Sequence, residues 1–360
     1  NSRLRGYPER ANPCALQANR RRYFFGATLH GDGFLLSEDE YKALLSRSPR
    51  NSERLFPFIG GEDLNTDPLL RPNGYVIAFG NSDLAAAERY PDLLRIVRER
   101  VKPGRDQLRE DSSAGRYRKT NWWKFAGTAS DLVEAIANLK RCLATAQVSK
   151  HLVFAFQPTD RMFNKTLCVF PFEESSSFAV IQSRVHEPWV RLLASSLEDR
   201  LRYAASDCFE TFPFPKPDPR TVIPSLETIG ERLHETRAKY MVDTDQGLTK
   251  TYNAIKDPSC SDPRILELRR LHEEMDRAVL DAYGWKDIAV PPYCPMSEAD
   301  REAVQAFEDE VIDRLYVLNA ERAREEQLAG QPAEGKKGAA AKKKPRGKKK
   351  GPDGQGEMFG

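Results

Sequence analysis

The chain has 360 residues, of which 40% are hydrophobic and 9% aromatic, as in an ordinary globular protein large enough for two compact domains. No run of about 18 apolar residues occurs, so the sequence predicts no membrane span; the start lacks an initiator Met and an apolar signal core, which suggests a fragment of a longer polypeptide. The six cysteines and five histidines are too scattered for a zinc site, so we expect free thiols in a cytoplasmic protein without a bound metal.

The net charge of +3 conceals an uneven distribution along the chain. Residues 331–360 carry nine Lys or Arg against three acidic residues, whereas positions 1–330 hold 47 basic against 50 acidic residues. Two basic stretches stand out in this body: residues 1–30, with six Arg against one Glu, and residues 95–124, with ten basic against four acidic residues. Because the body is not basic overall, nucleic-acid binding by it would have to use such local patches.

Residues 1–22 read as an irregular, Arg-rich segment, consistent with a cut inside a linker. In residues 23–215 short strands alternate with short helices, which predicts an α/β (α+β) domain. The strand patterns occupy Phe34–Leu36, Phe56–Ile59, Tyr75–Phe79, Cys142–Val148, Leu152–Phe156 and Leu167–Phe172. The helical patterns are Glu38–Leu45 with Ser37 as its cap, residues 83–101 with a kink at Pro91, and a helix after the capping-box pattern Thr128–Asp131. Residues 103–120 are polar and are predicted to form a surface loop.

The most strongly apolar part of this domain is predicted to be one core helix over residues 178–193. Its apolar residues recur at three- and four-residue steps, namely Phe178, Ile181, Val185, Trp189 and Leu192. The run Phe212–Pro215 follows and cannot be helical, because each Pro lacks an amide hydrogen and restricts its predecessor. We expect this extended strap to close the domain.

The remainder is predicted to be helical and then disordered. After a stiff linker at residues 216–220, a stripe from Ile265 to Ala282 predicts a helix that stops at Gly284, and Ser297 caps a last helix. Residues 216–330 are therefore predicted to form an all-α module. Residues 331–360, a Lys-rich tail, have too few large apolar residues to bury a core and are predicted to be disordered.

The motifs typical of catalysis are absent. The sequence has no Gly-rich phosphate loop, no GxSxG and no HExxH, and a turn is the better interpretation of the GxG at Gly31–Gly33. Val290–Tyr293 resembles the Asn/Asp-Pro-Pro-Tyr loop that grips the exocyclic amine of a flipped base, but the side chain of Val290 cannot accept a hydrogen bond. No catalytic, cofactor-binding or metal-binding residue is predicted.

Two segments are candidates for binding nucleic acid. In the first, cations that can neutralise phosphates alternate with aromatic rings that can stack on bases; its candidates are Arg116, Arg118, Lys119, Asn121, Trp122 and Lys124. The alternative is that Trp122, Trp123 and Phe125 are core residues and the cations form a wet rim. The second segment, Ser149, Lys150 and His151, is a polar break between two strands at a sheet edge, for which a plain reverse turn is the alternative.

Six ordered motifs resemble the C-terminal half of MmeI-like adenine-specific DNA methyltransferases of restriction-modification and phage-defence systems. They are Phe58–Asn65, Asn121–Phe125, Val148–Lys150, Ser183–Trp189, Leu201–Tyr203 and Cys208–Pro215. The resemblance implies a DNA target-recognition domain followed by a helical region, with a catalytic domain or partner upstream that binds S-adenosylmethionine. It also implies that Ser149, Lys150 and His151 read bases, and that Arg202 and Tyr203 contact phosphate.

The chain is thus predicted to be the DNA-recognition part of an adenine methyltransferase. The complete enzyme would flip an adenine out of double-stranded DNA and methylate its exocyclic amine from S-adenosylmethionine. The chain alone should bind DNA, bind no cofactor and transfer nothing. The alternative is a non-enzymatic nucleic-acid-binding or scaffold protein anchored by its Lys-rich tail.

Overall fold

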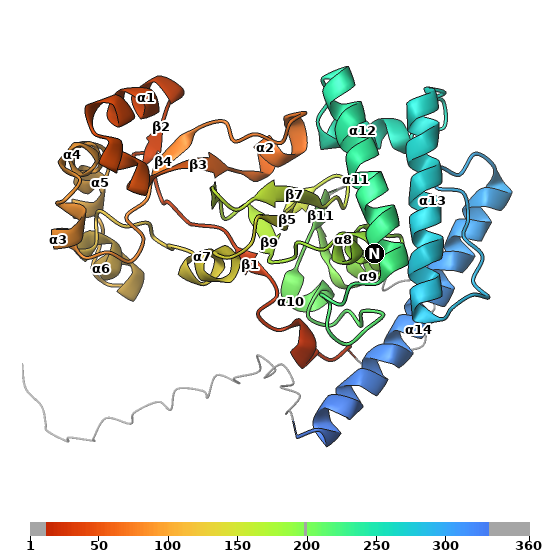
Figure 1. The fold of residues 1–360 in the computed structure, drawn as a ribbon. Helices are drawn as coiled ribbons and strands as arrows, with labels where there is room; N and C mark the ends of the chain where they lie inside the picture. The colour runs from red at the N-terminus through yellow and green to blue at the C-terminus, as the bar shows by residue number, and fades with distance from the viewer. Residues whose placement is uncertain (1–11, 198–199, 331–360) are drawn as a thin grey trace, which may run out of the picture.

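The computed structural model describes residues 12–197 and 200–330, whose ribbon is drawn in Figure 1. Their buried apolar side chains form two hydrophobic cores. The smaller core draws its buried side chains from positions between Ala27 and Phe125. The larger core extends from Ile59 to Leu315 and includes residues on both sides of position 215. The mixed α/β region followed by helices confirms the predicted fold class. The domain limits at 22, 215 and 330 stay predictions, and residues 331–360 lie outside the described residues.

The smaller core lies under a four-stranded sheet in the order β2-β4-β3-β8. These strands are β2 (Leu35–Leu36), β4 (Tyr75–Ile77), β3 (Leu55–Ile59) and β8 (Met162–Phe163). The helical elements here are α1 (Glu38–Arg47), η3 (Pro49–Arg54), α3 (Leu84–Ala87), α4 (Pro91–Arg100), α5 (Lys102–Asp106) and α6 (Ser113–Thr120). Helix α2 (Gly61–Thr66) follows β3 but places its buried Leu64 in the larger core. The cap at Ser37 is confirmed, because its side chain accepts from the Glu40 amide in a capping box.

Two predictions in this part of the chain were wrong. Residues 103–120 are not a loop, because they contain most of α5 and all of α6. Arg105 is only 3% exposed and donates to the Leu29 carbonyl, a tertiary contact that the polar sequence did not indicate. Thr128–Asp131 forms no capping box, since α7 (Ser130–Ile136) begins after Ala129 without a side-chain cap, and the Thr128 hydroxyl bonds Asn81 instead.

The larger core contains an antiparallel sheet in the order β1-β9-β5-β7. Its strands are β1 (Phe24–Phe25), β9 (Leu167–Phe170), β5 (Arg141–Ala146) and β7 (Ala155–Pro158), with Leu143 paired to both Phe170 and Phe156. A third sheet, in the order β10-β11-β6, consists of β10 (Ser195–Leu197), β11 (Arg200–Arg202) and β6 (Val148–Ser149). Strand β8 of the smaller sheet comes from the chain between β7 and β9, so its parallel pairing with β3 links the two parts of the molecule.

The predicted core helix is in fact two helices, α8 (Ser175–Gln182) and α9 (His186–Leu193). At the break, Ser183 has extended backbone angles, its hydroxyl donates to the Val180 carbonyl, and the Val185 amide donates to it. Every residue of α8 is buried. A short helix, α10 (Ala205–Cys208), follows, and then the predicted strap, in which the rings of Phe212 and Phe214 pack 5.1 Å apart.

The helical region consists of α11 (Pro224–Thr244), α12 (Leu248–Ile255), α13 (Pro263–Tyr283) and α14 (Glu298–Leu328). Both predicted ends are confirmed: Gly284 closes α13 with a positive φ of 81°, and Ser297 caps α14 in a capping box. The N-terminal residues of the described chain, including η2 (Gln17–Asn19), pack on α14. The Asn319 side-chain oxygen on this helix accepts a hydrogen bond from the Cys14 amide at 2.9 Å. Among the helices of residues 12–197 and 200–330, none is long and apolar enough to cross a membrane.

Candidate nucleic-acid interface

The pairing of β6 with β11 brings two predicted site segments together. In this antiparallel pair Leu201 faces Ser149 and Arg202 faces Val148, although the two strands are far apart in the sequence. The loop Ser149–His151 therefore lies beside Arg202 at one edge of the third sheet. We call Val148–His151 together with Arg200–Arg202 the recognition edge.

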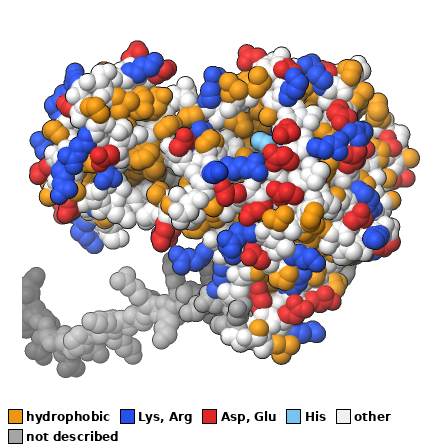
Figure 2. All heavy atoms as spheres, viewed as in Figure 1, with side chains coloured by type: hydrophobic (Ala, Val, Ile, Leu, Met, Phe, Trp, Pro, Cys, Tyr) orange, Lys and Arg blue, Asp and Glu red, His pale blue; other side chains and the backbone are white. Residues whose placement is uncertain are grey.

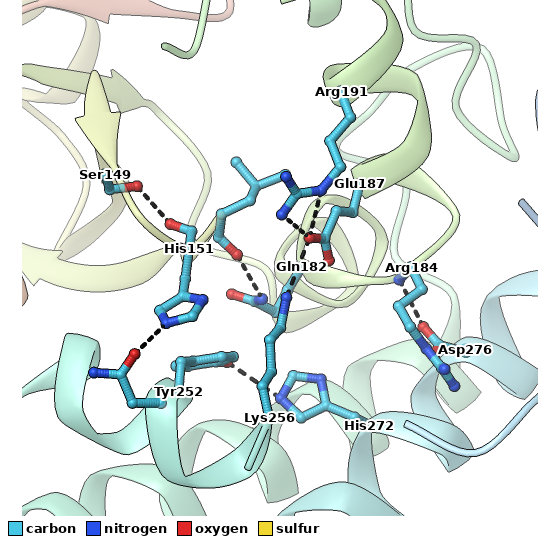
Figure 3. Close-up of polar contacts among 12 residues, drawn as sticks. Ser149, His151, Gln182, Arg184, Glu187, Arg191, Tyr252, Lys256, His272 and Asp276 are labelled. Carbon is cyan, nitrogen blue, oxygen red and sulfur yellow. Dashed lines mark hydrogen bonds and ion pairs between the residues drawn. The ribbon is translucent and has the colours of Figure 1, made fainter. Parts of the chain in front are cut away.

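Lys150 and His151 are tied to the same atom of α12. The Lys150 ammonium donates to the Asn253 side-chain oxygen at 2.8 Å. His151 Nε2 lies 2.9 Å from that oxygen, a contact drawn as a dashed line from the His151 ring in Figure 3. Because an amide oxygen only accepts, His151 Nε2 must carry the hydrogen. Burial lowers the pKa of His151, which is 8% exposed, so the ring is neutral at pH 7 and its Nδ1 has a free lone pair. The Ser149 hydroxyl donates to the His151 carbonyl and tightens the loop.

Arg202 and Tyr203 are adjacent in sequence but differ in surroundings. Arg202 is exposed and, within the described residues, has no hydrogen-bonding or ionic partner. Tyr203 is 3% exposed, its amide donates to the Gln147 carbonyl, and its hydroxyl lies 3.2 Å from His186 Nε2. Burial raises the pKa of Tyr203 well above its usual value, so the phenol stays neutral. Tyr203 therefore anchors the strand, and Arg202 is the one of the two that is exposed and can meet an anion.

The aromatic-cationic segment lies apart from the recognition edge, in the lobe that contains α6 (Figure 1). Trp122 is 7% exposed and Trp123 is 8% exposed, and both belong to the smaller core. This burial leaves the ring of Trp122 little surface for stacking on a base. As DNA contacts, Arg116, Arg118, Lys119, Asn121, Trp122 and Lys124 stay a prediction.

The polar side chains of this segment mostly bind their own lobe. Arg116 donates to the Glu110 carbonyl, Arg118 to the Ala114 carbonyl, and Lys119 pairs with the Glu110 carboxylate at 2.7 Å. The Asn121 side chain donates to the Tyr117 carbonyl at 3.0 Å and closes α6. Lys124 donates to the Asn81 carbonyl and lies 5.4 Å from the Trp123 ring.

A buried polar network underlies the loop of the recognition edge (Figure 3). The Gln182 side chain accepts from the Phe154 amide at 2.9 Å and donates to the Leu152 carbonyl at 3.4 Å, so α8 holds the backbone that follows His151. Arg237, which is 1% exposed, donates to the Phe154 carbonyl and to the Tyr252 hydroxyl.

This network continues to α13 through Tyr252, whose hydroxyl lies 3.2 Å from His272 Nε2. Burial lowers the pKa of His272 well below its usual value and keeps the ring neutral. No sequence pattern marked Gln182, Arg237, Tyr252 or Asn253 as site residues, because polar residues within helical patterns look like solvated faces until their partners are known.

The Val290–Tyr293 loop has a structural role. Arg184 pairs with Asp276 at 2.6 Å and donates to the carbonyls of Pro291 and Pro292. The Tyr293 ring stacks on His272 at 4.4 Å and lies beneath the Arg184 guanidinium. The loop thus clamps the start of α9 to α13, and its first position, Val290, offers no side-chain acceptor to an exocyclic amine.

The face of the molecule drawn in Figure 2 is not of a single charge. Figure 2 shows Lys and Arg side chains interspersed with Asp and Glu over the face viewed. Recognition of an anionic duplex by the described part of the chain would accordingly depend on local groups such as Arg202. Residues 12–197 and 200–330 contain no cluster of three or more His, Cys, Asp or Glu side chains that could hold a metal ion.

Known proteins resemble this chain in sequence and in fold. A family model described as "MmeI, target recognition domain" matches residues 15–216. "DNA methyltransferase A" of Bacillus subtilis (strain 168) is 23% identical over 300 residues, which are 81% of this chain and 29% of that protein. This chain therefore spans less than a third of that relative's length.

A solved structure shares the fold over most of the chain. It is described as "Structure of Type IIL restriction-modification enzyme MmeI in complex with DNA has implications for engineering of new specificities". The TM-score is 0.54 at 19% sequence identity, and the match covers 86% of this chain and 37% of that chain. At this identity the match shows a common fold alone.

Proposed function

This chain belongs to the family of MmeI target recognition domains, and we propose from this premise that it selects the DNA sequence at which a DNA methyltransferase acts. The family match includes the whole recognition edge, since β6 and β11 both lie within residues 15–216. The match to a target recognition domain is the observation that carries the proposal. The solved MmeI complex with DNA supports double-stranded DNA as the partner.

The recognition edge supplies the two kinds of contact that such a domain needs. Lys150 can donate to acceptors on a base edge, and the neutral His151 presents an acceptor nitrogen. Arg202 is an exposed guanidinium suited to phosphate, a contact that positions the protein without reading sequence. Base readout and backbone positioning would thus occur side by side on two paired strands.

We propose further that the methyl group comes from S-adenosylmethionine and that its acceptor is the exocyclic amine of adenine, as the motif resemblance implies. The catalytic chemistry would belong to a methyltransferase domain or partner that acts together with this chain. The Val290–Tyr293 loop does not fit the amine, because Val290 has no acceptor and the two prolyl carbonyls bind Arg184. The proposed role of this chain is therefore recognition, with no cofactor of its own.

The test is selection of bound duplexes from a randomised pool by the purified full chain at physiological ionic strength. We expect enrichment of one short motif. Binding without any enriched motif would refute sequence recognition. A parallel incubation with labelled S-adenosylmethionine and the enriched duplex should show no transfer by this chain alone, and transfer would overturn the assignment of the chemistry to another domain or partner.

A further inference from the structure

Asn253 holds two of the proposed base-reading side chains through a single atom. Its side-chain oxygen accepts from the Lys150 ammonium at 2.8 Å and contacts His151 Nε2 at 2.9 Å. It lies on α12, outside residues 15–216. Resting on the proposed function, we propose that Asn253 is a positioning residue that sets the sequence preference of the recognition edge. Specificity determinants then extend from the recognition domain into the helical region.

The chemistry of this contact determines how both side chains are presented. A free Lys ammonium samples many rotamers, and ordering it at the moment of binding weakens binding. The Asn253 oxygen directs one ammonium hydrogen toward α12 and leaves the other two for a ligand. The same oxygen selects the His151 tautomer with hydrogen on Nε2, so Nδ1 is the nitrogen left to accept.

Helix α12, which carries Asn253, is anchored along its length. It can therefore hold the loop Ser149–His151 in a fixed position. At its start Gly247 lies against Thr66 of α2, where an added Cβ would be 2.4 Å from backbone atoms. In its middle the buried Tyr252 hydroxyl binds Arg237 and lies within hydrogen-bonding distance of His272. At its end the Arg269 guanidinium donates to the carbonyls of Ile255 and Asp257 at 2.8 and 2.6 Å.

A stabilising role explains the Asn253–Lys150 bond poorly. Both residues are exposed, and hydrogen bonds between exposed polar side chains contribute little to the free energy of unfolding because water replaces them. The contact does constrain the conformations of Lys150 and His151. These two residues are the ones that the proposed function assigns to base reading.

The experiment compares variants of the full chain on the enriched duplex and on its single-base-pair variants. Asn253→Ala should lower the ratio of affinities for preferred over altered duplex by about ten-fold, the size of one lost base contact. Asn253→Asp keeps an acceptor for both donors, so it should preserve that ratio while weakening binding to every duplex. Gln327→Ala removes an exposed amide from α14 and serves as the matched control, with no change in the ratio.

The outcomes separate this inference from the proposed function. If Asn253→Ala leaves the affinity ratio within about two-fold of the unaltered chain, Asn253 is not a positioning residue. The same conclusion follows if Asn253→Asp lowers the ratio as much as Asn253→Ala does. If the unaltered chain enriches no motif at all, the proposed function itself fails. Thermal unfolding by circular dichroism, expected to be the same for all variants, verifies that the fold is intact.

Discussion

Lys150 and Arg202 are two exposed cations of the recognition edge that differ in their surroundings. Lys150 is held by Asn253, whereas Arg202 has no hydrogen-bonding or ionic partner among the described residues. Because the Asn253 oxygen fixes the orientation of the Lys150 ammonium, this group can discriminate between the acceptor patterns of different base edges. A free guanidinium adapts to phosphate oxygens along any sequence.

Lys150→Ala should change which duplex is preferred more than it changes overall affinity. Arg202→Ala, its matched control, should weaken binding to all duplexes about equally and should reduce the slope of log affinity against log salt by about 1. Titrations of the preferred and altered duplexes at several salt concentrations measure both effects. Equal weakening on every duplex by Lys150→Ala would instead identify Lys150 as a phosphate contact.

The buried histidines give the folded chain a sensitivity to acid. Burial lowers the pKa of His186 to about 3 and that of His234 to about 4, and it also lowers the pKa of His151 and of His272. In the unfolded chain histidine titrates near 6.5, so below that pH the unfolded state binds more protons. The contribution of these histidines to the free energy of unfolding is fully present above about pH 6.5. It is lost as the pH falls toward the pKa values that the histidines have in the folded state.

The free energy of unfolding should therefore decrease when the pH is lowered from 7 to 5. The titration of His186 alone should account for about 2 kcal/mol of this decrease. Urea denaturation at the two pH values measures the difference. Glu187 contributes little in this interval: burial would raise its pKa, but Lys256 and Arg191 lower it to about 2, so its loss of stability begins only below about pH 4.5. An unchanged free energy at pH 5 would contradict the buried, neutral state of these rings.

At the scale of elements, the break between α8 and α9 shows how a tertiary partner ends a helix. The Arg184 amide donates to the Asp276 carboxylate at 2.8 Å, and the guanidinium of the same residue pairs with that carboxylate. These bonds require the backbone to leave the helical path after Gln182. The apolar spacing on either side continues without interruption, so the sequence pattern predicted one helix.

The close packing of α11 against α8 leads to a second prediction, which concerns the contact between these two helices. Ala is favoured over Gly inside a helix by about 1 kcal/mol, but a Cβ on Gly230 would lie 2.3 Å from the Ser175 carbonyl oxygen. Because the backbone of α8 can move away from the added Cβ only by disturbing the packing of the core, Gly230→Ala should lower the free energy of unfolding by about 1–3 kcal/mol. Urea denaturation measures this change.

Gly104→Ala is the matched control for this contact. Gly104 lies in α5 and its added Cβ would meet nothing within 4 Å, so the substitution should stabilise by about 0.4–1 kcal/mol. Stabilisation by both substitutions would show that α11 is not pressed against α8 at Gly230.

At the scale of the whole molecule, the two cores are joined by close backbone contacts. Besides the β3–β8 pairing, an added Cβ on Gly26 would lie 2.3 Å from the backbone of Phe163 and Asn164. Helix α2 follows β3 directly and contacts both α12 and β5. The lobe that carries the aromatic-cationic segment is thereby held against the central sheet on which the recognition edge depends.

Deletion of residues 331–360 tests where specificity is located, because this segment carries nine basic against three acidic residues. We expect weaker binding to all duplexes and a shallower salt dependence, since phosphate neutralisation is lost without any base contact. The enriched motif should be unchanged. Disappearance of all duplex binding would favour the alternative of a protein anchored by its Lys-rich tail.

By itself the sequence determined the fold class, the ends at Ser37, Gly284 and Ser297, and the likeness to MmeI-like methyltransferases. Each depends on neighbouring residues or on the order of motifs, and both can be read along the chain. Only the tertiary structure decided that α8 ends at Gln182, that the Trp122 ring is buried, and that Asn253 meets Lys150. Those outcomes depend on partners far apart in the sequence, which a local pattern does not specify.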